Sequence, residues 1–153
     1  MKQLVLILTI LASTSLTAVG QDKKSYDVDF TDPKSVVNAI FYAAQTRDFA
    51  IMQMLCDSYG EGDGDTKGLC SIAAVAKQVD DYGGSENTKK GLNEFVKMFE
   101  SGRITGQVTY HKGDNGTEYA SVPFWFNHPG GESRSEETMK LVKRHGNWYL
   151  SSF

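Results

Sequence analysis

The sequence lacks the long apolar runs of a polytopic membrane protein, and it has no excess of basic charge. It has 16 basic and 19 acidic side chains, so its net charge is −3. This balance is too acidic for a general nucleic-acid binder, which needs a basic stripe to displace counterions from phosphates. Apolar residues still make up 40% of the chain, which is typical of an ordinary folded domain. A length of 153 residues is enough for one such domain.

Familiar catalytic and metal-binding motifs are also lacking. There is no Gly-x-Ser-x-Gly elbow, no phosphate-binding glycine loop and no His-Glu-x-x-His helix. His111, His128 and His145 have no metal-ligand spacing, and they fall at an expected strand end, a loop and a turn. From the sequence we therefore identify no catalytic residue, and we expect no metal and no cofactor.

Residues 1–20 have the pattern of a secretory signal peptide. One positive charge, Lys2, precedes a short apolar stretch, and small and polar residues follow it. Ala18 and Gly20 are at the two positions where a signal peptidase needs small side chains. We therefore expect cleavage before Gln21.

The alternative is a retained anchor, because the uncharged stretch 3–21 is nominally long enough to span a bilayer. Its second half is rich in serine and threonine, which disfavours an anchor. We expect an exported protein, periplasmic or secreted, with no stable membrane span after cleavage. The mature chain is then a flexible polar arm over residues 21–31 and one domain over residues 32–153.

Cys56 and Cys70 are the only cysteines, and export changes their interpretation. In an oxidising compartment an even count permits one disulfide. It would close a loop of roughly 15 residues and add about 3 kcal/mol of stability in the chain-entropy model. The enclosed segment 57–69 contains four glycines, so a covalent link restricts it strongly. The alternative is a pair of buried thiols on separate helices.

Apolar residues recur at helical spacing through the first part of the mature chain. Asp32 and Pro33 form an N-cap followed by proline at the first helical position, so they predict a helix over residues 33–46. Asp48 is expected to cap the helix after it. Further helical patterns cover residues 49–56, 69–79 and 92–99.

After the fourth helix the pattern changes from helical to alternating, which predicts β-strands. Ile104, Val108 and Tyr110 are expected on one side of a first strand. The Asp-Asn-Gly segment at 114–116 predicts a hairpin, because Asn-Gly accepts the positive φ angles of a type I′ turn.

A second strand is predicted over residues 119–126, where the even-numbered positions are all apolar. Pro123 lies within it and cannot donate a ladder hydrogen bond, so it indicates an edge strand or a bulge. Two more strands, 139–143 and 148–150, are joined by a tight turn at 145–147. Helices followed by an antiparallel meander predict an α+β fold, with the N-terminal helices packed on one face of a curved antiparallel sheet.

Both ends of this domain are similar to a known superfamily. Residues 32–37, with Ala-Ala at 43–44 and Arg-Asp-Phe at 47–49, are similar to the opening P-x-x-V-V-x-x-F-x-x-A-x-x-x-D-F pattern of nuclear transport factor 2-like domains. Residues 139–150 are similar to their closing hairpin, with Lys before a glycine-containing turn and Trp after it. The chain particularly resembles small exported bacterial members, related to the lumazine-binding-like and SnoaL-like groups.

The resemblance covers about residues 30–153 and implies a cone-shaped domain with a pocket between the helices and the sheet. The superfamily uses that pocket for isomerases, cyclases, dehydratases, ligand binding and protein interaction, so the fold leaves the function open. The cysteine-bounded glycine loop and a fourth helical segment depart from the usual pattern of three helices.

The functional expectation follows from what faces that pocket. The apolar side of the second strand carries no group that could act as a general base. We therefore expect a non-catalytic domain that binds a small apolar ligand or a partner protein through its pocket or sheet face, with contacts from Tyr42, Tyr110 and Trp125. The alternative is a small isomerase, cyclase or hydrolase-like enzyme using the same pocket. A third interpretation is a homodimer that pairs through the sheet.

Overall fold

The computed structural model describes residues 26–58, 64–128 and 136–152. The predicted signal peptide lies outside these residues. In chain order the elements are α1 (Pro33–Thr46), η1 (Phe49–Ile51), α2 (Met52–Leu55), α3 (Gly64–Tyr82), α4 (Glu86–Phe99), β1 (Arg103–Ile104), β2 (Thr109–Lys112), β3 (Glu118–Trp125), β4 (Glu136–Arg144) and β5 (Asn147–Ser152). Helices come first and strands second, which confirms the predicted α+β fold.

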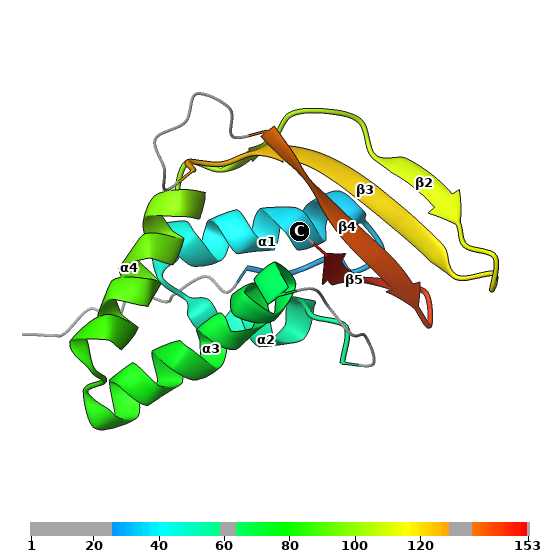
Figure 1. Cartoon of the computed structure of the whole chain (residues 1–153). Helices are drawn as coiled ribbons and strands as arrows, with labels where there is room; N and C mark the ends of the chain where they lie inside the picture. Colours follow the sequence, from blue (N-terminus) through cyan, green and yellow to red (C-terminus); the bar gives the residue numbers. More distant parts are fainter. Residues whose placement is uncertain (1–25, 59–63, 129–135, 153) are drawn as a thin grey trace, which may run out of the picture.

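The sheet is antiparallel and β3 is its central strand. β4 and then β5 lie on one side of β3, while β1 and β2 follow one another along its other side. Figure 1 shows the sheet curving over α1, with the other helices on the same side of the sheet as α1. The predicted packing of the helices on one face of a curved sheet is therefore confirmed.

Local sequence explains the limits of α1. The Asp32 carboxylate accepts a hydrogen bond from the backbone N–H of Lys34 at 2.9 Å, and Pro33 occupies the first turn. The helix ends at Arg47, whose φ of 58° is left-handed. These are the predicted bounds. Its buried residues form one apolar stripe: Pro33, Val36, Val37, Ala39, Ile40, Phe41, Ala43 and Ala44.

The prediction for Asp48 is wrong. Its side chain makes no capping hydrogen bond, and its φ of −87° and ψ of 75° are not the extended conformation of an N-cap. The segment after it divides into the 3₁₀ turn η1 and the single turn α2. The fourth helix ends as predicted but begins before residue 92, because Ser85 caps α4 by accepting from the N–H of Thr88.

The third helix is longer than the predicted 69–79. α3 begins inside the glycine-rich segment and continues to Tyr82. The helix extends beyond residue 79 because Asp81 pairs with Lys77 one turn earlier, which stabilises the last turn. Gly83, with a φ of 78°, then provides the left-handed residue that ends the helix.

The predicted first strand is divided into β1 and β2, and Pro123 explains the break. Pro123 is not on an edge strand, because β3 pairs on both sides. Its carbonyl accepts from the N–H of Thr105 at 3.0 Å, so its missing donor faces the segment 105–108 between the two short strands. Gly106 lies against the proline ring, where a Cβ would come within 3.1 Å of it. The hydrogen-bond ladder on this side of β3 is interrupted at Pro123, because proline has no N–H to donate.

The hairpin at 114–116 forms as predicted, but its turn type differs. A type I′ turn needs positive φ at both central residues, and here only Gly116 has one, at 81°. The N–H of Gly116 donates to the carbonyl of Gly113, and the N–H of Gly113 donates to the carbonyl of Thr117. The turn with two positive φ angles is instead at His145 and Gly146, at 52° and 89°, between β4 and β5.

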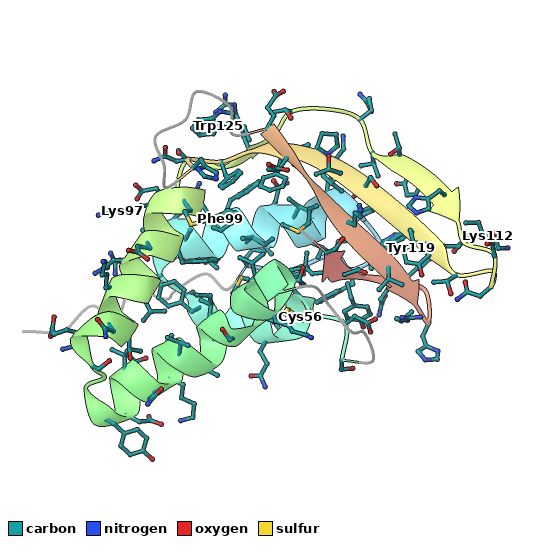
Figure 2. All side chains as sticks on the ribbon, viewed as in Figure 1. Cys56, Lys97, Phe99, Lys112, Tyr119 and Trp125 are labelled. Carbon is teal, nitrogen blue, oxygen red and sulfur yellow. A yellow bond between two sulfur atoms is a disulfide. The ribbon has the colours of Figure 1, made fainter. Side chains whose placement is uncertain are left out.

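The core lies between the helices and the concave face of the sheet. Ala120, Val122 and Phe124 on β3 have no exposed surface, which confirms the predicted apolar side. The Phe99 ring lies 6.5 Å from that of Phe124 and 5.6 Å from that of Phe126. Figure 2 shows Phe99 on α4 beside the sheet. Where the resemblance implies a pocket, this part of the interior is filled by aromatic rings.

Half of the predicted flexible arm is packed against the domain. Tyr26, Val28 and Phe30 are partly buried on the core, and the Phe30 carbonyl accepts from the N–H of Trp148 at 2.8 Å. Phe30 thus contacts β5, whereas the Tyr26 ring packs on Tyr42 of α1. Residues 21–25 lie outside the described part of the chain.

A second segment, Cys56–Asp57, ties the helices to β5. The disulfide between Cys56 and Cys70 is present, with the two Cα atoms 6.0 Å apart, as predicted. The N–H of Asp57 donates to the carbonyl of Leu150, and the Asp57 carboxylate accepts from Arg144 at 2.9 and 3.1 Å. The Asp57 side chain is 3% exposed, so this ion pair is shielded from water on one side.

Trp148 is expected to carry a large share of the stability. It is 4% exposed, and truncation to alanine should lower the free energy of unfolding by about 3–5 kcal/mol because a large cavity remains. Tyr82→Ala is the control, since that side chain is 85% exposed and its loss should change stability by less than about 0.5 kcal/mol. Urea unfolding followed by circular dichroism measures both. A Trp148→Ala loss below about 1 kcal/mol would contradict core burial.

Candidate functional site

The three aromatic residues predicted to contact a ligand lie in three different places. Tyr42 is on α1, Tyr110 is on β2 and Trp125 ends β3. Trp125 follows the buried Phe124, so it is on the face of the sheet that points away from α1 (Figure 2). The three side chains therefore do not line one shared pocket.

A groove of about 770 Å³ runs along one flank of α1, and it contains Tyr42. Its opposite wall is the segment 102–107, which includes β1. The described residues that line it are Tyr26, Lys34, Asn38, Phe41, Tyr42, Gln45, Gly102, Arg103, Ile104, Thr105, Gly106 and Gln107. The lining residues that come from α1 recur at helical spacing. Burial of the apolar stripe sets the rotation of α1, and that rotation turns these residues toward the groove.

Aromatic rings form part of the groove wall. The rings of Tyr26 and Tyr42 lie 4.8 Å apart and are tilted by 31°. Phe41 reaches the groove from the buried side of α1 and packs on Gly102. A Cβ at Gly102 would lie 2.2 Å from the Phe41 ring and 2.9 Å from the carbonyl oxygen of Phe99, so only glycine fits.

The charge in the groove has one sign. Lys34 and Arg103 line it, and there is no Asp or Glu among its described lining residues. The Arg103 guanidinium lies over the Trp125 ring, 4.5 Å from its centroid, in a cation–π contact. Arg103 and Trp125 are direct cross-strand partners, so this contact lies on the face of the sheet that points away from α1.

Tyr110 lines a second hollow of about 470 Å³, which lies between β2 and the β4–β5 hairpin. Two of its charged groups engage one another, because the Lys143 ammonium lies 3.1 Å from the Glu118 carboxylate, and the ammonium also lies 5.3 Å from the Trp148 ring. Tyr110 is 62% exposed and packs on Trp148 with ring centroids 5.8 Å apart. Because Lys143 is paired within the hollow, the groove is the stronger candidate site.

The two resolved pKa shifts lie away from the groove. Hydrogen bonds from the hydroxyl and then the N–H of Thr31 lower the pKa of the Asp29 carboxyl. A hydrogen bond to Asp81, with its negative charge, raises the pKa of Lys77. Within the described part of the chain, no three His, Cys, Asp or Glu residues are placed to hold a metal ion.

Comparison of the chain with protein-family models, with curated proteins and with solved structures finds no match. Among the described residues, no helix combines the length and the apolar character that crossing a membrane requires. The geometry of the groove therefore carries the functional argument.

Most residues of the groove were not predicted from the sequence; Tyr42 is the exception. Lys34, Asn38, Tyr42 and Gln45 form a flank beside the apolar stripe of α1, and this spacing is visible in the sequence. Helical spacing could therefore have grouped them. Their meeting with Arg103 could not be foreseen, because it depends on how β1 passes α1.

Gly102 provides a test of the groove wall. Gly102→Ala should lower the free energy of unfolding by about 1–3 kcal/mol, because its Cβ would displace Phe41 and meet backbone. Gly91→Ala is the matched control, since that glycine is inside α4 with open space at its Cβ. It should raise stability by about 0.5–1 kcal/mol. Equal effects of the two substitutions in chemical denaturation would contradict the close approach at Gly102.

Proposed function

We propose that the protein is an exported, non-catalytic binding domain whose groove beside α1 holds a small organic ligand. The observation that carries the proposal is the meeting, in one open groove, of the Tyr26–Tyr42 ring pair with polar side chains from α1, including Asn38 and Gln45. Ligand sites are typically about 300–1,000 Å³ and combine apolar walls with a few polar groups. The volume of the groove lies within this range, and its wall combines aromatic and aliphatic side chains with a larger share of polar ones.

Binding is favoured over catalysis by the residues that are available. Enzymes of this size class use a positioned acid or base, worth about 10²–10⁴-fold in rate. The described residues around the groove include no carboxylate and no imidazole. The filled interior beneath β3 also favours a surface groove over the enclosed pocket that an isomerase, cyclase or hydrolase-like enzyme would use.

Membership in the nuclear transport factor 2-like superfamily and export from the cell belong to the same proposal. The order of helices and antiparallel strands supports the first. The Cys56–Cys70 disulfide supports the second, because such bonds persist in oxidising compartments. The sequence pattern of residues 1–20 points the same way.

The proposal is tested by titrating ¹⁵N-labelled protein with a panel of phenyl-substituted alcohols, amides and carboxylates. Bound members should shift the amide resonances of Gly102 and Gly106, which line the groove. Tyr42→Ala should weaken their binding by about tenfold through loss of ring contact. Tyr82→Ala, an exposed tyrosine on α3, should leave binding unchanged.

Two results would overturn the proposal. One is the absence of shifts with every member of the panel. The other is a set of shifts centred on Tyr110 and Trp148, which would move the site to the second hollow.

A further inference from the structure

We propose that two copies of this chain pair through the face of the sheet that points away from α1, with a two-fold axis that runs along β3. The proposal does not depend on ligand binding in the groove, since it concerns the face of the sheet that no described helix covers. It rests on a row of three side chains that becomes complementary to itself when its order is reversed.

The outward face of the sheet is formed by the side chains that alternate with the buried ones. On β3 the outward residues are Tyr119, Ser121, Pro123 and Trp125, and each of them is half-buried. All described helices lie on the other side of the sheet (Figure 1), and Figure 2 shows Trp125 on the side away from them. Aromatic side chains on a face that no described helix covers are typical of a protein interface.

Three outward side chains form one row across β1, β3 and β4. Arg103 is the direct cross-strand partner of Trp125, and Trp125 is the direct partner of Glu136. Direct partners lie on the same face of an antiparallel sheet. The Arg103 guanidinium lies 4.5 Å from the centroid of the Trp125 ring, so it is held on this face. The row therefore has an aromatic centre between exposed charges of opposite sign, and Trp and Arg are the residues enriched at interfaces.

A two-fold axis along β3 pairs this row with its own copy. In a two-fold interface each contact occurs twice, because the same patch is used by both subunits. A half-turn about β3 reverses the order of the row, so Arg103 meets Glu136 of the partner subunit on both sides of the axis. The guanidinium fork matches the two oxygens of a carboxylate, which favours this contact. The central Trp125 then meets the partner subunit's Trp125.

The charges of the face exclude the other simple arrangement. An axis that runs across the strands, along the row, would place Arg103 on Arg103 of the partner subunit and Glu136 on Glu136 of the partner subunit. Such like-charge contacts are repulsive. With the axis along β3, Lys140 also avoids its own copy, because its row in the register brings it opposite Thr109 of the partner subunit. Stacked sheets keep their strands within about 30° of each other, which an axis along β3 allows.

Charge reversal tests the pairing directly. The mature chain should sediment as a dimer in analytical ultracentrifugation. Arg103→Glu and Glu136→Arg each create two like-charge contacts in the homodimer, so each should raise the dissociation constant at least about tenfold. An equimolar mixture of the two variants should form a heterodimer as tight as the wild-type dimer within about threefold, because both contacts again join opposite charges.

Matched controls separate this pairing from general charge and from folding. Lys90 and Glu94 form an ion pair at 3.7 Å on α4, on the other side of the sheet. Lys90→Glu and Glu94→Arg make the same two charge changes there and should each dimerise like the wild-type chain. Trp125→Ala should weaken the dimer at least about tenfold. Circular dichroism should show the same fold for all of these variants.

Each result supports or overturns the proposal. A wild-type chain that stays monomeric overturns it, and so does a dimer that neither Arg103→Glu nor Glu136→Arg weakens. If both reversals weaken the dimer but their mixture does not restore it, the axis along β3 is wrong. If the control variants weaken the dimer equally, the effect is one of general charge and the assigned contact is wrong. None of these results bears on ligand binding in the groove.

Discussion

The burial of α1 beneath the curved sheet is the constraint on which the rest of the structure depends. Its apolar stripe, from Val36 to Ala44, is almost without exposed surface, so the helix has only one rotation that buries it. That rotation places the flank with Lys34 and Tyr42 against the segment 102–107. The same packing that stabilises the domain thus creates the groove, with no separate element devoted to binding.

Segments at the edge of β5 hold this arrangement together. The Phe30 backbone bonds to one position of β5, and Cys56–Asp57 bonds to another while its disulfide reaches α3. The ion pair between Asp57 and Arg144 adds specificity, because a nearly buried carboxylate is costly unless its partner is in place. Covering β5 in this way also protects an edge that could otherwise pair with another chain.

The sequence predicts what is set by local chemistry. The limits of α1 follow from its cap and proline, and the apolar side of β3 follows from alternation. Long-range placement is different: Pro123 lies in the central strand and interrupts its pairing between β1 and β2, and no local pattern contains that information. Likewise, Tyr110 and Trp125 are aromatic positions that sequence could identify, but sheet register puts them on opposite faces and apart from Tyr42.

The most direct test of ligand binding in the groove beside α1 is a crystal structure of the mature domain with 4-phenylbutyrate bound. If the groove is the binding site, the phenyl ring lies against Tyr26 and Tyr42, and the polar end of the ligand lies among the hydrogen-bonding side chains of the groove. Ligand bound instead in the hollow beside Tyr110, or between the helices and the sheet, would contradict the account.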